Sequence, residues 1–334
     1  AAATAASIAN GASFPAGTAL LTVNPTPPPG FASTGIRINY EAPWIPRPAA
    51  SIARSEMASA VAGGKLYAAG GTTGSGAISI VQAFDPALGT WASVAGLPSG
   101  LRQHSMAESG GNLYVTGGID NGNNVQGTCL RYDPAANSWT AMASMPARWG
   151  HASVAVDGKI YVFGGYGTVG FAHMIATYVY DIAANSWSVG STLPTWRAQM
   201  QAREAGGKIY VMGGTVQASP LLPVAVNEAY DIASDSWSNA AAMPSGRAGF
   251  GALSDHGRLY VVGGEMGGPA NSALQYDPMA DSWLPLNPMI QGRRFFALGV
   301  INGKAYASQG FGAAHLATTE EYVMPKTVYL VEKI

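Results

Sequence analysis

Short runs of apolar residues that end in glycine recur at regular intervals along the chain. The runs are GGKLYAAGG ending at Gly71, GGNLYVTGG at Gly118, DGKIYVFGG at Gly165, GGKIYVMGG at Gly214, HGRLYVVGG at Gly264 and NGKAYASQG at Gly310. Each run is about one β-strand long and opens on a tight turn of the Gly-Lys type, which predicts a strand that follows a hairpin turn. The tyrosines of successive runs lie 46–50 residues apart. A fixed period of this length indicates a repeat architecture.

A second set of markers follows each of the first five runs. An aromatic–aspartate pair is followed, six residues after the aspartate, by a tryptophan: Phe84-Asp85 with Trp91, Tyr132-Asp133 with Trp139, Tyr180-Asp181 with Trp187, Tyr230-Asp231 with Trp237, and Tyr276-Asp277 with Trp283. Each repeat thus offers four short strands. One such unit cannot bury both of its faces, whereas six units stacked radially bury tyrosine and tryptophan between neighbours. The sequence therefore predicts an all-β fold, a six-bladed β-propeller with four-stranded antiparallel blades.

The glycine pair, the aromatic–aspartate pair and the tryptophan together resemble the repeat of the kelch family, over about residues 47–334. The resemblance implies the propeller fold but no single function, because kelch propellers include protein adaptors, sugar epimerases, specifier proteins of plant defence and copper oxidases. We expect residues 47–334 to form the propeller and residues 1–46 to form an N-terminal arm.

The sixth repeat lacks the tryptophan marker, so the sequence leaves open how the ring of blades closes. Closure is required, because open terminal blades would leave strand edges without a partner. The outer strand of the sixth blade could be the C-terminal segment TVYLVEKI, or the upstream segment INYEAPWIP with Tyr40 and Trp44. We expect residues 1 to about 35 to wrap over the outside of the propeller.

Composition narrows the classes of function. The formal net charge is −1, so overall charge does not favour binding to nucleic acid or to an anionic membrane. Cys129 is the only cysteine, which excludes an intramolecular disulfide and a multi-thiolate metal site. No apolar run is long enough to predict a transmembrane helix. The chain begins AAATAASIANG without a methionine, and we expect an exported protein, periplasmic or extracellular.

An arginine recurs ahead of every repeat. Thirteen residues before the repeat tyrosine lie Arg54, Arg148, Arg197, Arg247 and Arg293, while the second repeat has Leu101 there and Arg102 one place later. Strand direction predicts that these connections and the loops after the glycine pairs crowd the same mouth of the central channel. Any one arginine could pair with carbonyl groups or a nearby aspartate. As a set, six guanidinium groups repel one another and favour an anionic ligand, so we expect the set to bind one.

Further candidates lie just after the arginines and in the loops. His104 and His151 follow the arginine position by three residues in adjacent repeats, but no carboxylate lies at a matching third position, so we predict no metal site and no cofactor. The loops after the glycine pairs, which differ between repeats as functional loops tend to, contribute Asp120, Asn121, Tyr166, His173, Glu265 and His315. Amides, aromatic rings and arginines in one mouth favour a sugar-acid site.

Two kelch activities do not fit the residues. Copper oxidases of the kelch group need a cysteine cross-linked to a tyrosine, whereas Cys129 lies in a predicted strand; the iron-binding spacing of the plant specifier proteins is absent. The exported sialic-acid epimerases are more similar to this chain. That resemblance implies one group that takes the anomeric hydroxyl proton and another that donates to the ring oxygen. Glu265 is the candidate for one role, and His173 or Tyr166 for the other.

Three hypotheses follow. The leading one is a binding module: an exported kelch propeller that captures an anionic small molecule such as an acidic sugar, or an acidic segment of a partner protein. The alternative is an enzyme, a mutarotase or epimerase of a sugar acid. The third is a non-catalytic subunit of a larger secreted or periplasmic complex, attached through the N-terminal arm.

Overall fold

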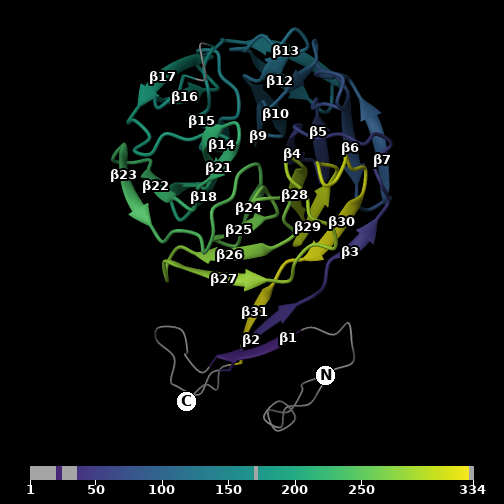
Figure 1. The fold of residues 1–334 in the computed structure, drawn as a ribbon, viewed down its shortest axis with the longest axis vertical. Coiled ribbons are helices and arrows are strands. Elements are labelled where there is room, and N and C mark those ends of the chain that lie inside the picture. The colour runs from purple at the N-terminus through teal and green to yellow at the C-terminus, as the bar shows by residue number, and fades with distance from the viewer. Residues whose placement is uncertain (1–19, 25–35, 169–171, 331–334) are drawn as a thin grey trace.

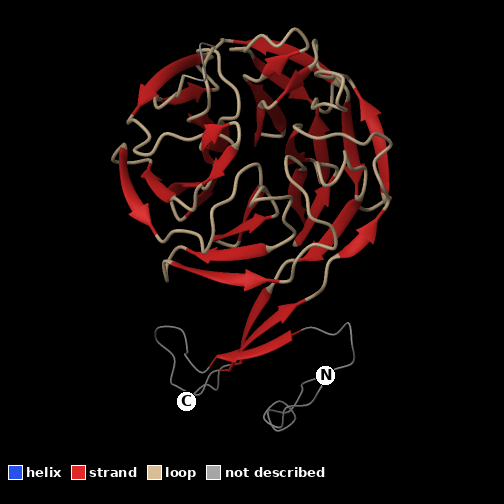
Figure 2. Ribbon diagram, viewed as in Figure 1, coloured by secondary structure: helices blue, strands red, loops and turns tan. Residues whose placement is uncertain are grey.

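The structure is a computed structural model that describes residues 20–24, 36–168 and 172–330. Within these ranges the regular structure consists of β-strands without any helix (Figure 2). Six four-stranded sheets stand like blades around a common centre, as Figure 1 shows. All neighbouring strands within a blade are antiparallel. The predicted six-bladed propeller is confirmed.

In every blade the first strand lies innermost, next to the channel, and the fourth lies outermost. Blade one contains β4 (Ala58–Ala62), β5 (Lys65–Ala69), β6 (Val81–Asp85) and β7 (Thr90–Val94). Blade two contains β9 (Ser105–Ser109), β10 (Asn112–Thr116), β12 (Cys129–Asp133) and β13 (Ser138–Met142). Blade three contains β14 (Ala152–Val156), β15 (Lys159–Phe163), β16 (Thr177–Asp181) and β17 (Ser186–Gly190).

The second half of the propeller follows the same order. Blade four contains β18 (Gln201–Ala205), β19 (Lys208–Met212), β22 (Asn227–Asp231) and β23 (Ser236–Ala240). Blade five contains β24 (Gly251–Asp255), β25 (Arg258–Val262), β26 (Ala273–Asp277) and β27 (Ser282–Leu286). Blade six contains β28 (Ala297–Ile301), β29 (Lys304–Ser308), β30 (Thr319–Val323) and β3 (Ile45–Arg47). Two short hairpins lie in the loops, β8 (Leu101–Arg102) with β11 (Ile119–Asp120) and β20 (Thr215–Ala218) with β21 (Leu221–Pro223).

The upstream segment closes the ring, because β3 precedes blade one in the chain yet forms the outer strand of blade six. Trp44, next to β3, occupies the place of the missing sixth tryptophan: its ring stacks on Tyr322, and its indole N–H donates to the carbonyl of Asn287 in blade five at 3.0 Å. Trp139 in blade two likewise donates to the carbonyl of Ala95 in blade one.

The other closure candidate pairs elsewhere. The C-terminal strand β31 (Lys326–Leu330) pairs with β2 (Ile36–Glu41), which also pairs with β1 (Leu20–Asn24), and in Figure 1 this sheet lies beside the propeller. Of the arm expected over residues 1 to about 35, residues 1–19 and 25–35 lie outside the described residues.

The hydrophobic core is divided among the six contacts between neighbouring blades. Tyr67 of blade one, for example, packs with Tyr132 and Trp139 of blade two, and Tyr161 of blade three packs with Trp237 of blade four. Between blades two and three the cluster includes Cys129, whose thiol is buried. Because apolar surface removed from water is the main source of folding free energy, each blade depends on both neighbours.

The glycine pairs mark places where the backbone passes close to a neighbouring inter-blade connection. A Cβ atom on Gly70 would lie 2.3 Å from the carbonyl oxygen of Leu101, and one on Gly71 would lie 2.4 Å from that of Ser55. Both residues also have positive φ, which glycine adopts without strain. Glycine at both positions therefore lets backbone pack where a side chain would clash.

A closed ring of backbone hydrogen bonds, which we call the collar, surrounds the channel. Its members are Glu56, Gln103, Gly150, Gln199, Gly249 and Phe295, one ahead of each blade. Each collar N–H donates to the carbonyl oxygen of the collar residue of the preceding blade at 2.5–3.0 Å, and the N–H of Glu56 donates to Phe295 to complete the circle. All six residues have φ between 50 and 63°. The collar thus links every blade to both neighbours beside the channel.

Candidate functional site

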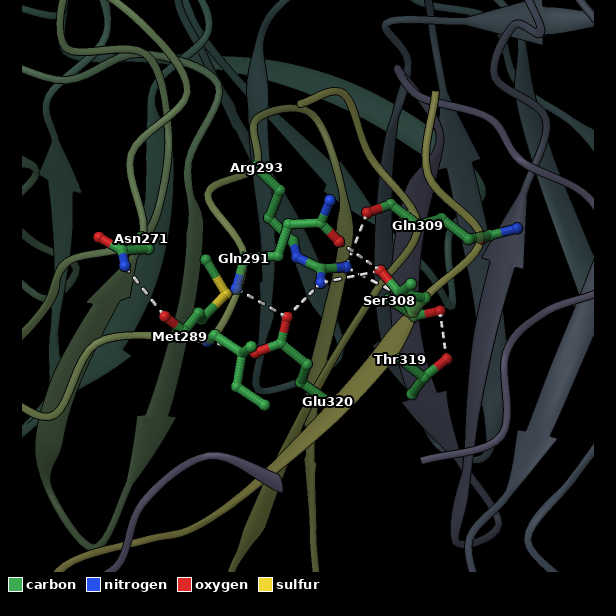
Figure 3. Close-up of polar contacts among 10 residues, drawn as sticks. Asn271, Met289, Gln291, Arg293, Ser308, Gln309, Thr319 and Glu320 are labelled. Carbon is green, nitrogen blue, oxygen red and sulfur yellow. Dashed lines mark hydrogen bonds and ion pairs between the residues drawn. The ribbon is translucent and has the colours of Figure 1, made fainter. Parts of the chain in front are cut away.

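Five of the arginines that precede the blades lie inside the blades, not at the mouth of the channel. Each is at most 1 % exposed: Arg54, Arg148, Arg197, Arg247 and Arg293. In Figure 3 the guanidinium group of Arg293 donates to the carbonyl of Gln309 at 2.9 Å and to the carboxylate of Glu320 at 2.5 Å. This corrects the expectation that six guanidinium groups line the mouth. The chain's own oxygen atoms accept the hydrogen bonds of these five.

The five arginines act as clamps within their blades. Arg54, for example, donates to the carbonyl groups of Ala68, Gly70 and Ile80, which lie at the end of β5 and just before β6. Two of the clamps also form a buried ion pair, Arg197 with Glu228 and Arg293 with Glu320. The others lack a carboxylate partner, and burial lowers the pKa to about 10 in Arg54, Arg148 and Arg247. These values leave the three guanidinium groups charged at neutral pH.

Blade two departs from this arrangement, and the departure places a charge at the mouth. The clamp position holds Leu101, which is buried in the cluster between blades one and two. Arg102 therefore stands one residue later, at a position that faces the channel mouth and that Arg294 occupies ahead of blade six. Ahead of blade one, which lies between blades six and two, Ser55 occupies this position.

A pocket of about 550 Å³, which we call the mouth pocket, lies over blades six, one and two. It is lined by Ser55, Glu56, Thr72, Gly74, Ser75, Gly76, Arg102, Asn121, Asn123, Arg294, Phe295, Phe311 and His315. The connections that precede the blades and the loops that follow the glycine pairs both contribute to it, as the strand directions predicted. The pocket combines guanidinium, amide, hydroxyl and aromatic groups, and its volume suits a small organic molecule.

Both arginines of the mouth pocket hold acidic partners. Arg102 lies 3.0 Å from the carboxylate of Glu56 and donates to the side-chain oxygen of Asn123 at 3.1 Å. Arg294 lies 2.5 Å from the carboxylate of Glu265, and its guanidinium carbon lies 5.2 Å from the centre of the Phe311 ring. An arginine has five N–H donors, so each keeps donors beyond these bonds.

The loop that presents the amide groups is organised by Asp120. Its carboxylate accepts hydrogen bonds from the backbone N–H groups of Gly122 and Asn124 and from the side chains of Asn124 and Gln126. The bonds with Asn124 are the main reason that the pKa of Asp120 is lowered. The predicted ligand-binding role of Asp120 is therefore replaced by a positioning role, and Asn121 and Asn123 line the pocket.

His104 and His151, predicted as ligand-binding residues, lie below the collar and are buried. Burial lowers the pKa of His104 to about 3 and holds the pKa of His151 well below its ordinary value. The imidazole of His151 shares a hydrogen bond of 3.0 Å with the hydroxyl of Thr116. The structure places both rings outside the mouth pocket, as packing groups next to the first glycine of the preceding blade.

Collar side chains narrow the channel beneath the mouth pocket. Gln199 donates to the side-chain oxygen of Gln103 at 3.2 Å, a bond that passes over the intervening Gly150. The ring of Phe295 lies over Gly249, where a Cβ atom would approach it within 2.4 Å. A cavity of about 80 Å³ lies at this level of the channel, bordered by the collar and by the residues just below it.

The sequence over residues 44–165 and 103–310 matches the family model described as the KLHDC2/KLHL20/DRC7 Kelch-repeats domain. The chain is a kelch-repeat protein. A solved structure described as "Structure of YjhT" is similar to this kelch chain with a TM-score of 0.72 and 19 % sequence identity, covering 85 % of this chain and 99 % of that one. At that sequence identity the similarity shows the fold alone. No curated protein matches the kelch chain.

The three candidate catalytic residues of the kelch chain are not brought together in the mouth pocket. Glu265 is bound to Arg294 and accepts the N–H of Gly267 at 3.1 Å. Tyr166 and His173 belong to blade three, where Tyr166 is buried against Trp149 and the His173 ring stacks on Trp196. This corrects the expectation that Glu265 and one of these two residues face a common substrate.

Among the acidic and basic residues of the mouth pocket, sequence reasoning missed Glu56 and Arg294. The signal for Arg294 was the doubled arginine of QGRRFF. The offset of thirteen residues before the repeat tyrosine selects Arg293. Arg294 lies twelve residues before that tyrosine, the same offset as Arg102. Of the predicted residues, Arg102, Asn121 and His315 line the pocket. The described part of the kelch chain has no cluster of three or more His, Cys, Asp or Glu residues suited to a metal ion, and none of its elements is a helix able to cross a membrane.

Proposed function

We propose that this kelch propeller binds a small sugar acid in the mouth pocket. The observation that carries the proposal is that Arg102 and Arg294 share one pocket with Asn121 and Asn123. Guanidinium groups bind carboxylates through charge-assisted hydrogen bonds, and amide side chains both donate to and accept from hydroxyl groups. Phe311 in the same pocket offers an apolar surface to the C–H face of a sugar ring.

The distribution of charge around the mouth favours a small molecule over an acidic protein segment. The mouth-facing position holds arginine ahead of blades two and six but Trp149, Ala198 and Ala248 ahead of blades three, four and five. Positive charge is thus concentrated over one side of the channel, together with the pocket. An extended acidic segment would find no matching arginine at this position on the other side.

Binding of N-acetylneuraminate, glucuronate and glucose, measured by isothermal titration calorimetry, tests the proposal. We expect Arg102→Gln and Arg294→Gln each to weaken binding of a sugar acid by roughly tenfold or more, because each removes a charge-assisted bond. Raised salt should weaken it as well, since exposed charges are screened. Glucose should bind more weakly than glucuronate.

The matched control is Arg258→Gln, which removes an arginine at the start of β25 that pairs with Asp277 at the end of β26, outside the pocket. It should leave sugar-acid affinity unchanged. Equal affinity of the wild type, Arg102→Gln and Arg294→Gln for every acid that binds, or stronger binding of the neutral sugar, would overturn the proposal.

Mutarotation of the bound sugar acid is a second candidate, favoured by one observation: Glu56 and His315 line the same pocket as the two arginines. A carboxylate can take the anomeric hydroxyl proton and an imidazole can donate to the ring oxygen. Exchange between the anomers, followed by NMR, should rise above the spontaneous rate with the wild type. It should fall with Glu56→Gln while binding persists; unchanged exchange would exclude this activity.

A further inference from the structure

A second polar cavity lies in the channel on the far side of the collar from the mouth pocket. Its inner part, of about 80 Å³ and called the inner chamber below, is lined by Ser105, Ser153, Gln201 and Arg203 among other residues. It leads to a cavity of about 240 Å³ at the opposite end of the propeller, which shares Ser153 and Arg203 with it. The inner chamber therefore has an opening that does not pass through the sugar-acid site.

Arg203 brings a positive charge into this chamber without an acidic partner. The residue belongs to β18, and its guanidinium group crosses to blade five, where it donates to the carbonyl of Ala252 at 2.8 Å; it also donates to the carbonyl of Ala202 at 2.6 Å. None of the ion pairs among the described residues includes Arg203. Burial lowers its pKa to about 10, which leaves it charged at neutral pH.

The clamps show why this arginine is different. Arg54 also lacks a carboxylate, but it is fully buried with four acceptor oxygens around it. Arg203 has two such acceptors and borders a cavity, so some of its five N–H donors are directed to no protein oxygen. Arg203 is half-buried, and a bound counter-ion offsets the cost of holding its charge there without an acidic partner.

Neutral donors surround the same space. The hydroxyl groups of Ser105 and Ser153 lie 2.6 Å apart, so one donates to the other and the second keeps its proton for another acceptor. The side chain of Gln201 lines the chamber, and its amide supplies two further donors. Glu108, the acidic residue of the outer cavity, is exposed and accepts the N–H of Gly111 instead.

We propose that the inner chamber binds a small monovalent anion of the halide class, held by Arg203 with help from Gln201 and the Ser105–Ser153 hydroxyl pair. The anion enters from the end of the channel opposite the mouth pocket. This site and the sugar-acid site lie on opposite sides of the collar and have no lining residue in common.

Bromide tests the proposal, because it can be located by anomalous diffraction. Crystals of the wild-type protein soaked in sodium bromide should show an anomalous peak within hydrogen-bond distance of the Arg203 guanidinium group. In solution, the melting temperature should rise saturably with sodium bromide relative to sodium fluoride at equal ionic strength, since binding to the folded state stabilises it. Fluoride is the comparison because its stronger hydration opposes entry into a small chamber.

Arg203→Gln should abolish the bromide peak and weaken the bromide affinity by roughly tenfold or more. Lys159→Gln, which removes an exposed positive charge at a blade hairpin, is the control and should respond like the wild type. Absence of a peak in the wild-type crystals, or an equal bromide response in wild type and Arg203→Gln, would overturn the proposal. If Arg203→Gln does not fold, the wild-type crystals alone decide.

Discussion

Trp44 and Tyr322 stack with ring centres 5.0 Å apart and an angle of 18° between the ring planes, which joins the two ends of the propeller. Because Trp44 is 4 % exposed and contributes to the core between blades five and six, we predict that Trp44→Ala lowers the free energy of unfolding by about 3–5 kcal/mol. Urea unfolding followed by circular dichroism measures the change. Ile45→Ala, at an exposed position of the adjoining strand β3, should cost far less; equal losses would contradict the special contribution of the Trp44 side chain.

Two of the clamps differ in what their removal leaves behind. Arg293→Met leaves the carboxylate of Glu320 buried with only the N–H groups of Ile290 and Gln291, so we expect a loss of about 3–5 kcal/mol. Arg247→Met leaves carbonyl and hydroxyl oxygens without their donor but leaves no buried charge. It should lower the free energy of unfolding by about 1–3 kcal/mol.

A double variant, compared with Arg293→Met by denaturant unfolding, tests whether the buried charge causes the loss. Adding Glu320→Gln to Arg293→Met removes the stranded charge, so the double variant should be more stable than the single one. A double variant less stable than Arg293→Met would mean that the buried charge is not the cause of the loss.

The two channel histidines predict a dependence of stability on pH. The folded pKa of His104 is lowered by burial to about 3 from an ordinary value of 6.5, so between these two values the unfolded chain binds a proton that the folded chain does not. Stability is therefore full above pH 6.5 and falls as the pH decreases, by about 1.4 kcal/mol per pH unit for each such histidine. His104→Phe introduces the residue found at this position in blades five and six. It should reduce the slope of unfolding free energy against pH by the contribution of one histidine.

Unfolding free energies measured at several pH values between 4 and 7 test this slope. His256→Asn is the control, because the His256 side chain is exposed. An unchanged slope in His104→Phe would contradict the buried neutral state of His104.

Asp120 is predicted to order the loop that presents Asn121 and Asn123. Asp120→Ala removes the carboxylate that accepts from Gly122, Asn124 and Gln126. It should increase hydrogen–deuterium exchange in residues 120–127 while leaving global stability nearly unchanged, because the loop lies at the surface. Asp133→Ala, which removes a similar turn in the outer hairpin of blade two, should raise exchange only around residues 133–138. Unaltered exchange in the Asp120 loop would show that its backbone is held by other contacts.

The fold could be predicted from the sequence because its markers are local and repeated. A tyrosine, a glycine pair and a tryptophan at fixed offsets report strand, close approach and inter-blade packing in every blade. The sequence offered the segment of the closing strand β3 as one of two candidates but could not decide between them, because three residues carry little pattern of their own and Trp44 precedes the strand instead of following an aspartate. Its partner Tyr322 is evident only from the folded chain.

The candidate site was predictable in location and only partly in residues. Sequence offsets show where an arginine stands along the chain, but they do not show the carbonyl oxygens that turn the side chain of Arg148 back into its blade. The irregular case was the informative one: Leu101 fills the clamp position with an apolar group, and Arg102 is displaced towards the mouth. A break in an otherwise uniform repeat is thus a better guide to a residue of the mouth pocket in this propeller than the repeat itself.

The collar has a consequence for how the chain can be rearranged. Its six bonds form a circle in which no blade is first or last, and each link depends on one backbone N–H and one carbonyl, whatever the side chain. A circularly permuted chain whose new ends lie in an outer hairpin keeps every link. A chain with one blade deleted or duplicated has to form a collar with a different number of bonds and a different radius. The collar therefore couples the number of repeats to the width of the channel.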